Sequence, residues 1–269
     1  MVTDLPAGPE PVFIDVGSAT KARKIAVRAR TGEGCGVFWL GGFSSDMQGI
    51  KATALDAWAA AEGRPIVRFD YSGHGESPGE FRDGTMGIWL EESLAVFERF
   101  CAGPQIVVGS SMGGWMALLL ARELRKRQIA GAPSAGTIAR MVLVAPAVDM
   151  TEELMWKNFP SGIRERIETS GVWMMPSNED VTPITRELIE DGRQHLLLGS
   201  AIDVGCPLRI LQGGQDSVVP WRHAFALIER LPADDVVLTL IQDGDHPLSR
   251  PQDITRLIAA VAEPLPESG

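Results

Sequence analysis

The chain has 269 residues, of which 45% are hydrophobic and 22% are charged, and its formal net charge at pH 7 is −10. This composition excludes disordered, collagen-like and disulfide-rich classes and is typical of a globular protein with a buried core. The acidic balance argues against a nucleic-acid-binding protein, which needs clustered lysine and arginine for phosphate contacts. No apolar run reaches the roughly 18 residues of a transmembrane helix.

Short apolar runs alternate with longer helical patterns along most of the chain. In chain order, the first part is expected to contain strands at 11–16, 24–30 and 36–40, a helix at 46–62, a strand at 65–71, a helix at 85–100, a strand at 105–109, a helix at 112–127 and a strand at 139–146. Thr85 is a typical N-cap residue for the second helix. The alternation resumes near the C-terminus with strand 207–212, helix 221–231, strand 236–241 and helix 253–262.

The predicted strands are mostly continuous apolar runs, which indicates a sheet that is covered on both faces. Because helices separate most of them, we expect a mostly parallel sheet of eight strands. The alternation breaks in residues 148–204, which contain helical patches, tryptophans and methionines but no clear strand. We therefore predict one α/β domain over residues 1–269, with a small helical lid at about 148–204.

The pattern G-x-S-x-G occurs twice, around Ser111 and around Ser77. A nucleophile elbow needs a strand before the serine and a helix after it, because the sharp turn lifts the serine to the top of the sheet. Ser111 follows QIVVG and precedes a long helical pattern, whereas Ser77 is followed by Pro78 and a loop. Ser111 is therefore the predicted nucleophile, and Ser77 is interpreted as part of a turn.

A serine hydroxyl needs a base, and the base needs an acid that orients it. The four histidines are His74, His195, His223 and His246. His246 is the predicted base, because it lies just after the last strand and because the usual chain order is serine, acid, histidine. Asp216, in the loop after strand 207–212, is the predicted acid. Asp149, after strand 139–146, is the alternative.

Two backbone N–H groups are expected to stabilise the oxyanion of the reaction. One is the N–H of Met112, directly after the nucleophile and at the start of a helix. The other is the N–H of Phe43, because Gly41 and Gly42 leave the preceding backbone free to turn its N–H groups inward.

Five segments together resemble the α/β-hydrolase superfamily over nearly the whole chain: LGGFSSDM, FDYSGHGESPG, VVGSSMGGW, GGQDSVVP and DGDHP. More narrowly, the first three are similar to the branch that contains the mitochondrial palmitoyl-protein thioesterase and mycophenolic-acid acyl-glucuronide esterase, with its bacterial relatives. The resemblance implies an α/β-hydrolase fold, with Ser111 as nucleophile, Asp216 as acid and His246 as base. It also implies hydrolysis of esters or thioesters through an acyl-enzyme. The predicted reaction requires no metal and no cofactor. One departure is Gly41, where many members have a histidine that the backbone donors do not need.

The predicted lid offers side chains that suit an acyl chain. Methionine is adaptable and tryptophan presents a large apolar area, so Trp156, Trp173 and Met174 are candidates for a substrate pocket. The alternative is that these side chains only pack the lid onto the core.

The expected partner is a small-molecule acyl ester or thioester. The first 20 residues are acidic and lack arginine, unlike a mitochondrial transit peptide, and the three cysteines are widely spaced, so we expect a cytoplasmic location. Lactone hydrolysis, C–C bond hydrolysis and perhydrolysis on the same three residues remain open. A non-catalytic ligand-binding protein is a further alternative.

Overall fold

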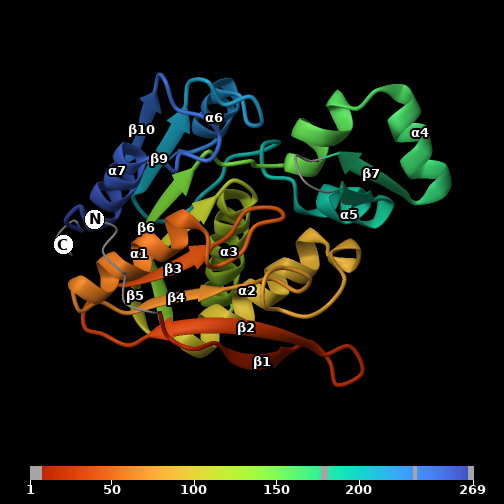
Figure 1. Ribbon diagram of the computed structural model, residues 1–269. Coiled ribbons are helices and arrows are strands. Elements are labelled where there is room, and N and C mark those ends of the chain that lie inside the picture. Colours follow the sequence, from red (N-terminus) through yellow and green to blue (C-terminus); the bar gives the residue numbers. More distant parts are fainter. Residues whose placement is uncertain (1–7, 177–180, 233–234, 266–269) are drawn as a thin grey trace, which may run out of the picture.

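The fold is known from a computed structural model that describes residues 8–176, 181–232 and 235–265 (Figure 1). Its centre is an eight-stranded sheet in the order β1-β2-β4-β3-β5-β6-β9-β10. The strands are β1 Val12–Val16, β2 Arg23–Arg30, β3 Gly36–Leu40, β4 Ile66–Phe69, β5 Gly103–Ser110, β6 Gly136–Val144, β9 Leu208–Gly213 and β10 Val236–Ile241. β2 is antiparallel to both β1 and β4, and all other neighbours run parallel. The predicted sheet is confirmed, and each predicted strand is present with bounds that differ by a few residues.

The α-helices of the described chain are α1 Ile50–Ala61, α2 Met86–Phe100, α3 Met112–Ile129, α4 Ser161–Ser170, α5 Arg186–Gly192, α6 Trp221–Ile228 and α7 Pro251–Ala262. α2 begins as predicted, because the Thr85 hydroxyl accepts the N–H of Ile88 at 3.3 Å. α1 begins at Ile50 rather than at residue 46. The reason is local: the Asp46 carboxylate accepts the N–H of Gln48 at 2.7 Å, which makes a turn before the helix.

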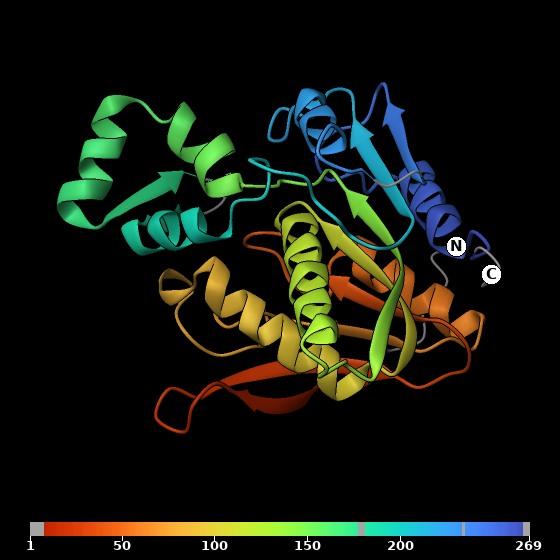
Figure 2. The same cartoon turned by 180° about the vertical axis from the view of Figure 1, so that it is seen from behind.

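The sheet separates two apolar cores. Figure 1 and Figure 2 show α2 and α3 on one face of the sheet and α1 and α7 on the other. Along β3, Phe38 and Leu40 belong to the α2–α3 core, whereas Val37 and Trp39 belong to the α1–α7 core. The period-two alternation of a strand is therefore present, although both of its faces are apolar.

Residues between β6 and β9 form the predicted lid, which projects beside the main body (Figure 1). It contains α4 and α5, but also β7 Val172–Pro176 and β8 Val181–Thr185, which pair antiparallel. Three shorter elements are a π-helical turn at Met150–Met155 and 3₁₀ turns at Trp156–Asn158 and Arg193–His195. The expectation of a lid without strands was wrong. The hairpin was missed because both of its strands are short and contain proline, which is depleted in strands.

The turn between β5 and α3 depends on two glycines that contact backbone. A Cβ added at Gly113 would lie 2.1 Å from the carbonyl oxygen of Leu40, and a Cβ added at Gly109 would lie 2.2 Å from that of Gly113. These are backbone atoms, so a side chain cannot move aside to make room. We expect Gly113→Ala to lower the free energy of unfolding by about 3 kcal/mol or more.

Urea unfolding followed by circular dichroism measures this effect. Gly162→Ala in α4 is the matched control, because a Cβ there would meet no atom within 4 Å. The control is expected to change stability by less than about 1 kcal/mol. Equal effects of the two substitutions would contradict the packing argument.

Candidate active site

Ser111 lies in the sharp turn between β5 and α3. Its φ is 54° and its ψ is −118°, a backbone conformation that residues other than glycine rarely adopt. Hydrogen bonds on both sides hold it there: the Ser111 N–H donates to the Val144 carbonyl at 2.8 Å, and the Ala147 N–H donates to the Ser111 carbonyl at 3.0 Å. The strained turn presents the hydroxyl at the carboxyl end of the sheet, as a nucleophile elbow requires.

The predicted acid and base lie in loops after two neighbouring strands and meet beside Ser111. His246 Nε2 lies 3.1 Å from Ser111 Oγ, and His246 Nδ1 lies 2.8 Å from Asp216 Oδ2. These distances allow proton transfer from the serine to the imidazole. The structure thus brings Ser111, Asp216 and His246 together from positions far apart in the sequence.

The Asp216 carboxylate is fully buried and is fixed by its own loop. Its Oδ1 accepts the N–H groups of Val218 at 2.9 Å and Val219 at 2.8 Å. Its Oδ2 accepts the side-chain amide of Gln212 at 3.2 Å in addition to the imidazole. With both oxygens held, the carboxylate can fix one orientation and one tautomer of His246.

Phe43 belongs to the loop after β3, and Met112 directly follows Ser111 in the chain. A Cβ added at Gly42, next to Phe43, would lie only 3.4 Å from Ser111 Cβ. Neither the Phe43 nor the Met112 N–H donates a hydrogen bond to any described residue. Both donors can therefore serve an external oxyanion, and their predicted role stays a proposal.

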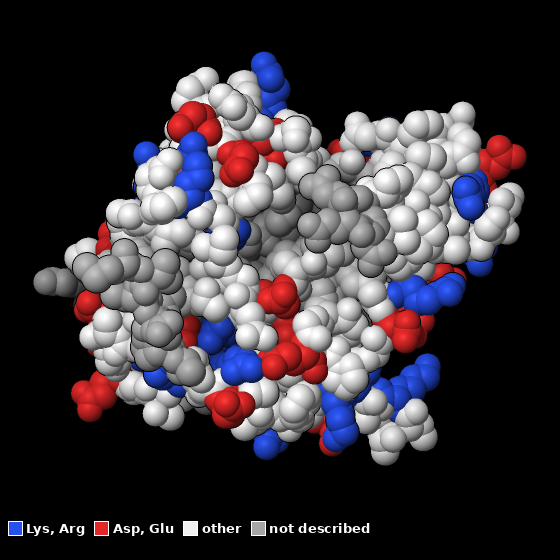
Figure 3. All heavy atoms as spheres, viewed as in Figure 1, with Lys and Arg blue, Asp and Glu red and all other residues white. Residues whose placement is uncertain are grey.

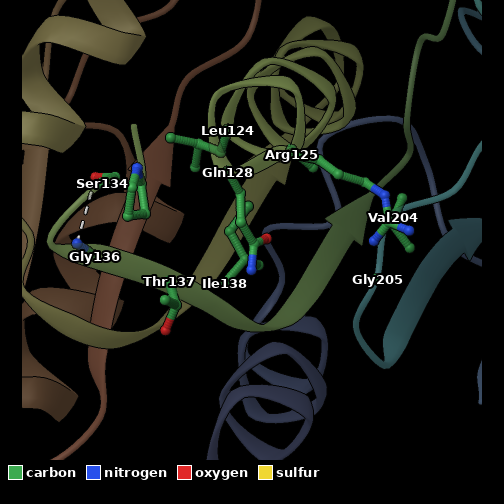
Figure 4. Close-up of a pocket in the computed structure, with 11 residues that line it drawn as sticks. Leu124, Arg125, Gln128, Ser134, Gly136, Thr137, Ile138, Val204 and Gly205 are labelled. Carbon is green, nitrogen blue, oxygen red and sulfur yellow. Dashed lines mark hydrogen bonds between the residues drawn. The ribbon is translucent and has the colours of Figure 1, made fainter. Parts of the chain in front are cut away.

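A cavity of about 200 Å³ opens beside Ser111 and His246. It lies between the loop after β3, the first turn of α1 and the His246 loop. Its lining consists of Trp39, Gly42, Phe43, Ser45, Asp46, Gly49, Ile50, Lys51, Ser110, Ser111, His246 and Pro247. Figure 3 shows that the molecular surface is hollowed between the main body and the lid. Another cavity, of about 220 Å³, lies between α3 and the start of β6, and neither Ser111, Asp216 nor His246 lines it (Figure 4).

The candidate pocket residues of the lid do not line the cavity beside Ser111. The ring of Trp173 packs edge-on against Phe159 at 5.2 Å, and the Arg193 guanidinium lies 4.9 Å from the ring centre of Trp156. Met174 is 42% exposed. Both tryptophans thus make contacts within the lid, and their role in a substrate pocket stays a prediction.

Asp149, the alternative acid, and Ser77, which the sequence placed in a turn, have other contacts. The Asp149 carboxylate accepts the N–H groups of Leu197 and Leu198 at 2.8 and 2.9 Å, so it ties the end of the lid to its beginning. Burial raises the pKa of Asp149. The Ser77 hydroxyl donates to the Asp70 carbonyl at 2.6 Å and accepts the Ala26 N–H at 2.8 Å. Neither side chain makes a hydrogen bond with His246.

The sequence patterns gave no sign of Lys51, which lines the cavity beside Ser111. Its ammonium donates to the Pro247 carbonyl and, at 3.3 Å, to Ser249 Oγ. It therefore connects α1 to the loop that carries His246. The two ends of this contact lie 196 positions apart, so no local pattern could have revealed it.

His74 supports the loop of Phe43 from within an aromatic cluster. Its ring lies 4.9 Å from that of Phe81 and 5.2 Å from that of Trp89, and both of these rings contact Phe43. Burial, only partly offset by the hydrogen bond to the Ser72 carbonyl, lowers the pKa of His74 from 6.5 to about 4. The neutral imidazole is therefore the form that the fold accommodates.

This pKa predicts a loss of stability in acid. A folded-state pKa below the unfolded value means that the unfolded chain binds more protons. The stability that the neutral His74 contributes is therefore present above pH 6.5 and is lost as the pH falls towards 4. When the pH is lowered from 7.5 to 5, the titration of His74 is expected to lower the free energy of unfolding by about 2 kcal/mol. Urea unfolding of wild type and of His74→Phe at both pH values measures this loss, since the variant has no imidazole to protonate at this position. An equal change in both proteins would contradict the assignment.

The comparisons with known proteins agree with this geometry. Residues 36–261 match the model of the "Alpha/beta hydrolase family". The chain belongs to the alpha/beta hydrolase family. The resemblance seen in the sequence motifs is thereby confirmed, and the same match supports the assignment of the fold.

Comparison with individual proteins shows to which members of the family the chain is similar. The chain is 32% identical over 240 residues to the mitochondrial palmitoyl-protein thioesterase ABHD10 of Homo sapiens, a match that covers 88% of this chain and 75% of that protein. Among solved structures, it is similar to a putative hydrolase from Agrobacterium vitis S4, with 46% identity, a TM-score of 0.90, and 94% and 97% of the two chains covered. It is also similar to mouse alpha/beta hydrolase domain-containing protein 10, with 30% identity, a TM-score of 0.80, and 93% and 96% covered. The chain is therefore an alpha/beta hydrolase related to thioesterases.

None of the helices in the described part of the chain is long and apolar enough to cross a membrane.

Proposed function

We propose that this chain is a serine hydrolase that cleaves carboxylic esters or acyl thioesters through an acyl-enzyme. The observation that carries the proposal is the hydrogen-bonded series Asp216–His246–Ser111, with contacts of 2.8 and 3.1 Å, on a strained turn at the carboxyl end of the sheet. The relationship to a protein named as a palmitoyl-protein thioesterase supports acyl thioesters as one substrate class.

The first half of the reaction transfers the acyl group to the enzyme. Ser111 Oγ attacks the acyl carbon while His246 Nε2 takes its proton. The N–H groups of Phe43 and Met112 stabilise the negative charge on the former carbonyl oxygen. When the tetrahedral intermediate collapses, the bond to the alcohol or thiol breaks, and His246 donates its proton to that leaving group. Asp216 stabilises the imidazolium between these two proton transfers.

The second half releases the acid. A water molecule loses its proton to His246 Nε2 and attacks the acyl carbon of the Ser111 ester. The same two N–H groups stabilise the second oxyanion, and the proton returns to Ser111 Oγ as the ester bond breaks. The described residues thus supply a nucleophile, a base, an orienting acid and two oxyanion donors.

Labelling with a fluorophosphonate probe tests the proposal directly. The wild-type chain is expected to be labelled once and to hydrolyse members of a panel of esters and thioesters with matched acyl groups. Ser111→Ala is expected to lose both labelling and turnover, whereas Ser77→Ala is expected to keep labelling if it folds. Undiminished labelling of Ser111→Ala would refute the nucleophile. A labelled protein that cleaves lactones or C–C bonds but no ester or thioester would place the chemistry in another class.

A further inference from the structure

The cavity beside Ser111 holds polar groups that the proposed mechanism does not use. Trp39 enters it from β3, Lys51 from the first turn of α1, and Asp46 from the loop between them. None of these three groups is needed to activate the serine or to hold the oxyanion. Their position next to Ser111 and His246 raises the question of which part of a substrate they contact.

The indole N–H of Trp39 is the most informative of these groups. The side chain is 3% exposed, and its Nε1 makes no hydrogen bond with any residue that the structure describes. A buried donor without a partner is unfavourable, so such a group beside a cavity indicates an acceptor that arrives from outside the chain.

The loop glycines show how close this donor lies to the reacting centre. A Cβ added at Gly41 would lie 3.9 Å from Trp39 Nε1, and a Cβ added at Gly42 would lie 3.4 Å from Ser111 Cβ. Two consecutive residues of one loop therefore lie next to the unpartnered donor and next to the nucleophile.

Lys51 gives the cavity a second donor. Its ammonium uses two of its three N–H groups on the Pro247 carbonyl and on Ser249 Oγ, and burial lowers its pKa. Asp46 lines the same cavity and brings a carboxylate. One cation and one anion leave the cavity with little net charge, which favours a neutral ligand with oxygen acceptors over a phosphate or a carboxylate.

The size and the position of the cavity decide which part of the substrate it takes. A volume of about 200 Å³ is comparable to that of cavities that hold a single benzene ring, so the cavity has room for a compact group. His246 and Pro247 form one wall, and His246 is the residue that must donate a proton to the leaving group. The compact alcohol or thiol, rather than the acyl chain, is the part that this position suits.

Resting on the proposed hydrolase function, we infer that this cavity is a leaving-group subsite for a compact, neutral, hydroxyl-bearing alcohol or thiol, with Trp39 Nε1–H as the donor that selects it. Lys51 both supports the His246 loop and offers a further N–H to the same group. The lid side of Ser111 is left for the acyl chain.

Two butanoate esters with three-carbon leaving groups test this inference: the 2,3-dihydroxypropyl ester and the n-propyl ester. Acid release in a pH-stat gives kcat/KM for each. Wild type is expected to prefer the dihydroxypropyl ester by at least roughly fivefold, and Trp39→Phe is expected to bring that ratio close to one, mainly through KM. The matched control is Trp58→Phe on α1, since Trp58 packs against Arg64 and does not line the cavity. The control should keep the wild-type ratio.

A binding measurement separates this inference from the proposed function. Calorimetry with Ser111→Ala gives the affinity for both esters without turnover, and the dihydroxypropyl ester is expected to bind at least roughly fivefold tighter. If wild type is neither labelled by the fluorophosphonate nor active on either ester, the proposed function fails, whereas the calorimetric ratio still reports on the subsite. A ratio near one in wild type or in Ser111→Ala would overturn the subsite. An unchanged ratio in a folded Trp39→Phe protein would overturn the role of the indole N–H.

Discussion

Replacing His246 with alanine is expected to lower kcat on an ester about as far as replacing Ser111 does, by about 10⁵- to 10⁶-fold. The reason is the 3.1 Å contact between His246 Nε2 and Ser111 Oγ, which in the proposed reaction is the path by which the hydroxyl loses its proton. Without the imidazole the serine is a weak nucleophile, and without the serine the imidazole has nothing to activate. The double variant is therefore expected to be no slower than either single variant.

Single-turnover and steady-state rates with a p-nitrophenyl ester measure all three variants. His223→Gln is a suitable control, because His223 Nε2 contacts the Val148 carbonyl at 2.8 Å and the residue plays no part in the proposed reaction. It is expected to keep kcat within about threefold of wild type. Losses that add in the double variant would show that the two residues act in separate steps.

Much of this arrangement was predictable because it depends on local sequence. The wholly apolar strands indicate burial on both faces of the sheet, and the order of strand, serine and helix is enough to distinguish Ser111 from Ser77. Gly109 and Gly113 belong to the same pattern, since a Cβ at Gly109 would meet the backbone of α3 and a Cβ at Gly113 would meet the backbone at the end of β3. The strands and the turn around Ser111 were therefore predicted from short stretches of sequence.

The contacts that were not predictable join distant parts of the chain. Lys51 meets the His246 loop, and β7 pairs with β8 in a lid whose short strands give a weak signal. The cavity residue Trp39 resembles any other apolar strand residue in the sequence, and only the structure shows that its N–H lacks a partner in the described chain. Long-range pairing, rather than local propensity, decides such features.

The choice between Asp216 and Asp149 shows the same limit. Each follows a strand, and β6 and β9 are neighbours in the sheet, so the sequence allowed either carboxylate to reach the histidine. In the structure Asp149 adopts a left-handed conformation, with φ 54°, and turns its carboxylate towards the N–H groups of Leu197 and Leu198. Asp216 contacts the imidazole instead.

Asp216→Asn is accordingly expected to lower kcat by about 10⁴-fold with little change in KM. An amide in place of the carboxylate can present an N–H to Nδ1, which favours the tautomer with its proton on Nε2, and that tautomer cannot accept the serine proton. Asp149→Asn is the matched control: asparagine tolerates the left-handed backbone and still accepts one N–H, so kcat should stay within about threefold. If Asp149→Asn were the slow variant and Asp216→Asn kept its kcat, Asp149 rather than Asp216 would be the acid.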